Sequence, residues 1–435
     1  MKKIIITVVI IAALLFAVTP NFIGQRAETE FKNLYSQIDN SQEFSVAVTD
    51  YQRGWFSSTA VVELVVDLTQ FDPQATEQII FKLQNEISHG PLLTEVKAME
   101  LGLVDINSRI EFPDVMLKEM PEFNESFNEL VTIQNRMYFD GSMFGLVEMQ
   151  EFEFKDTDVN LTISPAKFEA ITSAQGRILS TGFWDGMSIS DNGTFGITFG
   201  KMLLDFDMTS LSGNLYDTTG IYTGTSNMSI AEMRMTGQEL PGVIVLNDIT
   251  LDSKSSVADE LLSFDINMGV SEIDAMGMSF TQLEFNQTFS NLDIKALQEM
   301  NAFLSAQTTD EQLVAQMGEL TRIAMTLLEK QPVYEMRQLG VMTAQGAINS
   351  SMTARLDQDL VDPANIESVA QAIILNASGT IPEAFLTSLG IMPMVQPFVD
   401  QGYLTKDTDN LAFEFTYQQG QMSLSGKPFP MAPTQ

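Results

Sequence analysis

The sequence contains no cysteine and only one histidine, His89, among 435 residues. The chain therefore forms no disulfide, uses no thiol in catalysis and offers no thiolate to zinc or an iron–sulfur cluster. A single imidazole is also too little for a metal site built of histidines. We expect a protein that folds through its own core and holds neither a metal ion nor another cofactor.

Basic residues are scarce, with 23 Lys and Arg against 57 Asp and Glu, which gives a net charge of −34. Charged residues make up only 18% of the chain and hydrophobic residues 44%, so this is not a disordered acidic tail. Nucleic-acid backbones bind clustered cations, which are missing here. The composition excludes nucleic acid as a partner.

One long hydrophobic run lies at the N-terminus, where Lys2 and Lys3 precede apolar residues 4–23. About 20 apolar residues span a bilayer, so we interpret residues 1–25 as a transmembrane signal-anchor that leaves the N-terminus in the cytoplasm. A cleaved signal peptide is the alternative, although Pro20 and the lack of suitably spaced small residues disfavour cleavage. The expected location is the bacterial inner membrane, single-pass, with the bulk in the periplasm.

Residues 26–42 are expected to form a juxtamembrane helix. Ala27, Phe31, Leu34 and Tyr35 lie on one face, at helical spacing. We expect this apolar stripe to pack on the domain that follows.

Residues 43–294 alternate between apolar and polar positions, as in Phe44, Val46 and Val48, and tight turns containing Gly, Asn or Asp interrupt the runs. This pattern predicts an α+β, mainly β fold with long antiparallel twisted sheets and flanking helices.

Helical periodicity returns in a helical hairpin at residues 295–332. Residues 333–435 are predicted to contain strands, a helix at 382–402 kinked by prolines, and a closing hairpin. The second helix of the 295–332 hairpin has an apolar stripe that packs on a sheet or forms a dimer or partner face. Its members are Leu313, Met317, Leu320 and Leu327. An oligomer is compatible with this stripe, and the sequence leaves the oligomeric state undetermined.

Catalysis of the Ser–His–Asp kind has to use His89, yet no Gly-x-Ser-x-Gly elbow provides the nucleophile. Phosphate-binding glycine loops are also missing. Beside Gly90 and Pro91, His89 is better interpreted as a turn residue that bonds a neighbouring backbone group. We predict a non-enzymatic protein.

Paired carboxylates are the remaining catalytic alternative, because a hydrolase acting on envelope glycan needs two acids in one cleft. Glu148, Glu151 and Glu153, like Asp205 and Asp207, alternate along predicted strands, which is typical of a solvated face. The chain also has 26 Met and 29 Phe, which indicate either a loosely packed core or a groove for acyl chains.

Five short motifs stand out along the chain. They are Tyr51, Arg53, Gly54, Trp55 and Phe56; then His89, Gly90 and Pro91; then Gly237 and Glu239; then Gly402 and Tyr403; and lastly Gly426 within residues 419–427. In this order and spacing they resemble the motifs of the YdgA-like family of bacterial envelope proteins, a domain of unknown function. The resemblance spans essentially the whole chain, with departures at Leu92, where an aromatic residue is common, and at Ser425, where asparagine is usual.

The resemblance implies a single-pass inner-membrane protein with a periplasmic β-rich domain and no assigned enzyme activity. The first motif is also similar in pattern to the strand openings of AsmA-like envelope proteins, whose long curved sheets are thought to carry lipid. Similarity of pattern does not establish function.

The first motif is predicted to be a hairpin in which Gly54 supplies a positive φ while Tyr51, Trp55 and Phe56 brace the strands. The alternative is that Arg53 faces a lipid phosphate or a partner. The leading functional hypothesis is a membrane-anchored envelope scaffold, or a surface that binds lipid or another hydrophobic ligand. Alternatives are the glycan hydrolase and an assembly subunit that uses the face from Leu313 to Leu327.

Overall fold

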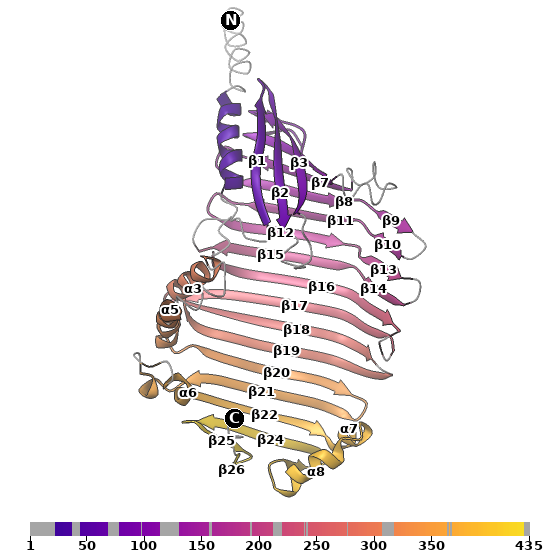
Figure 1. Ribbon diagram of the computed structural model, residues 1–435, viewed down its shortest axis with the longest axis vertical. Helices are drawn as coiled ribbons and strands as arrows, with labels where there is room; N and C mark the ends of the chain where they lie inside the picture. Colours follow the sequence, from indigo (N-terminus) through magenta and orange to yellow (C-terminus); the bar gives the residue numbers. More distant parts are fainter. Residues whose placement is uncertain are drawn as a thin grey trace, which may run out of the picture. The chain divides into compact units, whose positions relative to one another are not determined.

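The computed structural model (Figure 1) describes most of the chain. The described residues are 22–36, 44–67, 78–96, 98–113, 130–155, 159–191, 194–211, 220–238, 240, 242–275, 277–306, 317–362, 365 and 368–429. The predicted anchor lies outside this set apart from residues 22–25, and so do Leu313 and Glu239. Within the described residues, no helix has both the length and the apolar character needed to cross a membrane.

The chain divides into two compact units that interleave in sequence. Unit 1 contains Met1–Glu153, Thr162–Gly186 and Asp205–Gly220, and unit 2 contains Phe154–Leu161, Met187–Leu204 and Ile221–Gln435. The predicted β region 43–294 is therefore shared between the two units.

Unit 1 is built on an antiparallel sheet in which each strand pairs with the next one named. The strands are β1 (Phe44–Arg53), β2 (Ser57–Asp67), β3 (Gln78–His89), β6 (Val104–Glu111), β7 (Val131–Met137), β8 (Met143–Met149), β11 (Ala166–Thr172) and β12 (Arg177–Trp184). The short strands β4 (Leu92–Leu93) and β5 (Glu100–Leu101) pair separately. Three further strands include residues of both units, namely β9 (Phe152–Lys155), β10 (Val159–Ile163) and β15 (Met202–Ser210).

A helix at residues 22–36, drawn in indigo beside β1 in Figure 1, covers one face of this sheet. Ile23, Ala27 and Phe31 lie four residues apart on the helix and are buried. They pack against Val62, Ile106 and their neighbours on β2, β3 and β6. The helix begins before the predicted residue 26 and buries the stripe that the helical spacing indicates.

The strands of unit 2 are also antiparallel and include the longest of the 24-stranded sheet to which the strands of unit 1 belong. Its strands pair in this order: β13 (Met187–Asp191), β14 (Phe195–Phe199), β16 (Tyr222–Gly237), β17 (Ile244–Ala258), β18 (Leu261–Ala275), β19 (Met278–Asp293), β20 (Val333–Thr343), β21 (Gly346–Leu356), β22 (Ile373–Pro382), β24 (Asn410–Gln418), β25 (Gln421–Leu424) and β26 (Lys427–Pro428), with β23 (Thr405–Asp407) also on β24. The prediction of a mainly β, antiparallel fold with a few helices is confirmed.

The helices of unit 2 lie between its strands along the chain. Helices α3 (Ile294–Ala306) and α5 (Met317–Glu329) pair through Arg322 and Glu299, whose charged atoms lie 2.6 Å apart, and both contact β19. A 3₁₀ turn at Gln358–Leu360 and helix α6 (Ser368–Ala372) lie between β21 and β22.

The single helix predicted at 382–402 is two helices, α7 (Glu383–Ser388) and α8 (Met392–Asp400). The interruption is at Gly390, whose φ of +72° is a left-handed conformation that ends a helix. Pro393 lies in the first turn of α8, where a missing N–H costs nothing, so the prolines do not cause the break.

Candidate functional site

The only imidazole of the chain lies in the core of unit 1. His89, at the end of β3, has its Nε2 2.9 Å from the Oγ of Ser58 on β2. This distance suits a nucleophile and its general base. Both side chains are buried, however, so a substrate carbonyl has no route to the Ser58 hydroxyl.

Helix 22–36 closes this site at Gly24. A β-carbon placed on Gly24 would lie 2.4 Å from Cε1 and 2.6 Å from Nδ1 of His89, far inside van der Waals contact. Only glycine lets the helix backbone approach the ring this closely. The His89 motif therefore holds the helix on the sheet. Gly24 lies 65 residues before His89, so their contact is not apparent from local sequence patterns.

The residues after His89 continue the tight packing. A β-carbon on Gly90 would lie 1.9 Å from the carbonyl oxygen of Gly102, and the N–H of Gly102 donates to the carbonyl of Pro91 at 3.0 Å. The second motif thus positions the chain between β3 and β6 by backbone contact.

The first motif forms the β1–β2 turn, but not as predicted. Gly54 does not have a positive φ; instead, a β-carbon there would lie 2.6 Å from the carbonyl oxygen of Ser57. Trp55 and Phe56 are exposed and do not brace the strands, whereas Tyr51 packs on Phe31 of the helix with ring centroids 5.8 Å apart.

The cation of this motif binds the helix. Arg53 Nη1 lies 3.2 Å from a carboxylate oxygen of Glu28, and the Arg53 side chain is 38% exposed. The contact accounts for Arg53 within the chain, without a lipid phosphate or a partner.

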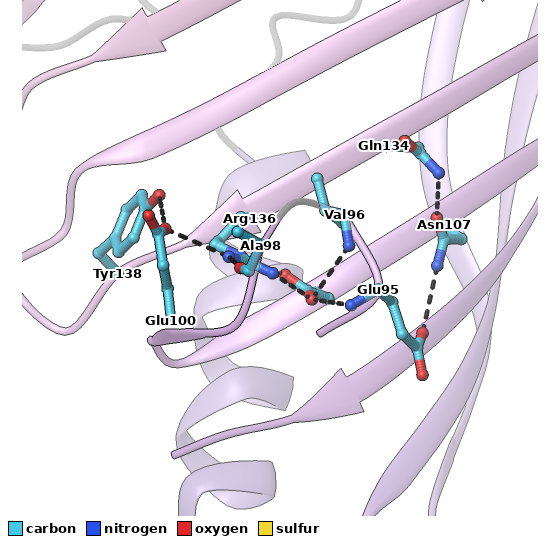
Figure 2. Close-up of polar contacts among 9 residues, drawn as sticks. Glu95, Val96, Ala98, Glu100, Asn107, Gln134, Arg136 and Tyr138 are labelled. Atoms are coloured by element: carbon cyan, nitrogen blue, oxygen red, sulfur yellow. Dashed lines mark hydrogen bonds and ion pairs between the residues drawn. The ribbon is translucent and has the colours of Figure 1, made fainter. Parts of the chain in front are cut away.

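A buried ion pair fixes the segment between β4 and β6. Arg136 on β7 donates to Asp105 on β6 through Nε at 2.7 Å and Nη2 at 2.8 Å, and both side chains are fully buried. Figure 2 shows Arg136 also reaching the carbonyl oxygen of Ala98 and the carboxylate of Glu100, which accepts from Tyr138. These hydrogen bonds to Asp105 and Glu100, together with Coulomb attraction to Asp105, raise the pKa of Arg136, which stays charged.

The carboxylate of Asp105 also accepts hydrogen bonds from the backbone. Its Oδ2 accepts the backbone N–H groups of Glu95 at 3.0 Å and Val96 at 3.3 Å. A second chain of contacts runs from Glu95 through Asn107 to Gln134 (Figure 2). The network clamps Glu95, Val96, Ala98 and Glu100 through the fully buried pair of Asp105 and Arg136.

The C-terminal motifs meet in unit 2. Gly402 and Gly426 adopt positive φ of 73° and 75°, and Tyr403 Oη donates to the carbonyl oxygen of Pro428 at 3.2 Å. The carbonyl of Tyr403 accepts from Ser425 Oγ at 2.8 Å. These residues close the last hairpin, whereas Gly237 ends β16 apart from them.

The carboxylates named from the sequence lie on exposed strand faces. Glu148 and Glu169 flank Lys167 at 3.5 and 3.2 Å, and Asp207 pairs with Arg177 at 2.7 Å. The hydrogen bond from Arg177 lowers the pKa of Asp207. Among the described residues, no group of three or more His, Asp or Glu could hold a metal ion.

Two acids share a hollow of about 380 Å³ on unit 1, Glu86 on β3 and Glu111 on β6. Glu111 pairs with Lys82, four residues along β3 from Glu86. At about 3.3 Å per residue their backbones are about 13 Å apart.

The predicted partner stripe on α5 is partly covered. Leu320 and Leu327 are half-buried, while Ile323 and Met325 are the buried side chains. Leu313 and the side chain of Met317 lie outside the described residues. The helix therefore turns a different set of residues toward α3 and β19 than the stripe suggested.

The sheet of unit 2 holds the most extended apolar surface among the described residues. Five strands align one apolar residue each in a single cross-strand row, which we call the apolar rung; it consists of Met228, Leu251, Met268, Phe285 and Leu339. The neighbouring row, the polar rung, has only polar side chains and points to the opposite face; it consists of Asn227, Asp252, Asn267, Asn286 and Gln338.

The apolar face extends to both sides of the apolar rung. One parallel row contains Ile249, Val270 and Leu283, and another stacks Phe264 on Phe289 with centroids 4.8 Å apart. We call these rows together the apolar face of unit 2.

The middle of this face is only partly covered in the described chain. Leu339 is 40% exposed and the other members of the apolar rung are half-buried. Val270, in the row beside the apolar rung, is buried, and so are Leu262, Leu386 and Leu411.

A family model described as a bacterial protein of unknown function, DUF945, matches residues 1–432. The chain belongs to this family. No curated protein and no solved structure matches it. The DUF945 match covers nearly the whole chain and hence both units.

Substituting Gly24 by Ala tests the contact between helix 22–36 and His89 in this DUF945 chain. The added methyl group overlaps the His89 ring, so we expect the helix to lose about 1–3 kcal/mol of docking free energy, although alanine favours helices. Hydrogen exchange of the helix amides measures this loss. Gly318→Ala in α5 is the matched control, because nothing lies within 4 Å of its β-carbon position. Equal protection in both variants would contradict the contact.

Substituting Asp105 by Asn tests the clamp. The change removes the buried counter-ion of Arg136 and leaves only the partly exposed Glu100, so we expect the free energy of unfolding to fall by about 3 kcal/mol. Urea denaturation followed by circular dichroism measures it. Asp207→Asn breaks an exposed pair of the same bidentate geometry, Arg177 with Asp207, and should change stability little. If Asp105→Asn costs no more than Asp207→Asn, the clamp does not stabilise unit 1.

Proposed function

We propose that this chain is a non-enzymatic, membrane-anchored envelope protein whose apolar face of unit 2 binds the acyl chain of a lipid. The apolar run that begins at residue 4 anchors it in the bacterial inner membrane, and the described residues lie in the periplasm. Within the DUF945 family we place the chain among the YdgA-like proteins, because it has the five motifs named above.

The observation that carries the proposal is the pairing of an apolar rung with a polar rung across the same five strands. Neighbouring strands lie about 4.8 Å apart, so the apolar rung is about 19 Å long. Half of a bilayer hydrocarbon core, which is the length of one acyl chain, is about 15 Å. One acyl chain laid across the strands therefore spans about four of the five members of the rung.

The composition of the face also suits a lipid. Methionine and phenylalanine provide three of the five residues of the apolar rung, and methionine adapts its shape to a flexible chain. A small polar substrate gains nothing from such a surface.

The sites in unit 1 support a non-enzymatic role. Helix 22–36 covers the buried pair of Ser58 and His89. The carboxyl groups of Asp140, Asp207 and Glu319 have a lowered pKa, each chiefly through a side-chain hydrogen bond. A glycosidase acid needs a raised pKa.

Site-specific photocrosslinking tests the proposal. The photoreactive residue p-benzoylphenylalanine replaces Phe285 on the apolar rung or, in the matched control, Asn286 on the polar rung. Both residues lie in the middle of β19 and are half-buried, so they differ mainly in the face they occupy. After irradiation of membranes that contain the full chain, mass spectrometry should find phospholipid joined at position 285 and not at 286.

Two outcomes contradict the proposal. Crosslinks to lipid at both positions at equal yield indicate contact without a preferred face. Crosslinks at position 285 to a protein alone indicate that the apolar face of unit 2 is an assembly surface.

A further inference from the structure

Five large apolar side chains are exposed at one end of unit 1. Phe22 is the first described residue of helix 22–36, Trp55 and Phe56 form the β1–β2 turn, and Leu92 and Leu101 face each other across β4 and β5. Their exposed fractions run from 43% for Leu92 to 66% for Phe22. We call these five residues the end patch.

Backbone contacts near His89 link the segments that carry the end patch. The N–H of His89 donates to the carbonyl of Phe56 at 2.8 Å, and the ring of His89 lies against Gly24, two residues after Phe22. The N–H of Gly102, next to Leu101, donates to the carbonyl of Pro91, next to Leu92. Four separate segments therefore bring their exposed apolar residues to the same end of unit 1.

We propose that the end patch inserts into the interfacial layer of a phospholipid bilayer, in direct contact with lipid. This inference rests on the anchor in the proposed function, because the apolar run 4–23 enters the described structure at Phe22, within the patch. A bilayer that holds residues 4–21 meets the end patch first. The patch is the part of unit 1 that touches the membrane, and it fixes the orientation of the unit at the membrane surface.

The chemistry of the patch suits that layer. Trp and other aromatic side chains concentrate where hydrocarbon meets headgroups, and an apolar face there reaches about 5–10 Å into the bilayer. The charges of the adjoining helix are paired, Arg53 with Glu28 and Arg26 with Glu30, so inserting the patch removes few lone charges from water. With a chain net charge of −34, contact has to come from apolar insertion and not from attraction to anionic lipid.

The chain offers a built-in probe, because it has only two tryptophans, Trp55 and Trp184. The Trp184→Phe variant leaves Trp55 as the only indole. The Trp55→Phe variant leaves Trp184 on β12 and serves as the matched control. The indole N–H of Trp184 donates to the backbone carbonyl oxygen of Ser164 at 3.2 Å. Each full-length variant is reconstituted in phosphatidylcholine vesicles, separated by flotation, and compared with vesicles whose phosphatidylcholine has brominated acyl chains.

Brominated chains should remove about half of the Trp55 emission, since bromine quenches only indoles at hydrocarbon depth, and should leave Trp184 unchanged. If the protein floats with the vesicles and Trp55 is not quenched, the end patch does not insert, while the anchor of the proposed function stands. A protein that fails to float contradicts both. Quenching of both tryptophans also overturns the inference. So does shielding of Trp55 that depends on protein concentration in lipid-free detergent, because that result identifies a second copy of the chain as the partner that covers the end patch.

Discussion

A β-sheet with one apolar face has to cover that face, and the two units meet this constraint to different degrees. In unit 1, helix 22–36 lies on the sheet and buries it with Ile23, Ala27 and Phe31. In unit 2, Val270 of the apolar face is buried, but the apolar rung is only partly buried and Leu339 is exposed. The covered face is a scaffold, and the partly open one is the binding surface that we propose.

The stability of unit 1 and its place at the membrane depend on the same residues. The glycine at position 24 lets the helix reach His89, and the Asp105 and Arg136 pair holds residues 95–100 in place. The segments fixed in this way also present the end patch. This link explains why tight backbone packing surrounds a histidine that has no route to substrate: the packing holds exposed apolar side chains at the end where the N-terminal run enters.

The alternation of apolar and polar residues was enough to predict the strands and the closing hairpin, because the strand period is local in sequence. The clamp was not predictable, since Asp105 and Arg136 are 31 residues apart and meet only through the β6–β7 register. The apolar rung also depends on register, which shifts at irregularities such as Asp248, with φ of 49°. The predicted role of Gly54 was wrong. Glycine is required there by the close approach of another backbone atom and not by a positive φ.

Native mass spectrometry of the full-length protein, extracted from membranes in mild detergent, tests the central claim that the apolar face of unit 2 binds lipid. The account predicts a phospholipid adduct that persists on the wild-type chain and on Gln338→Glu, but is lost from Leu339→Glu. These substitutions place the same charge on adjacent residues of β20 that belong to opposite faces. A bare wild-type chain, or adducts retained equally by both variants, would contradict the account.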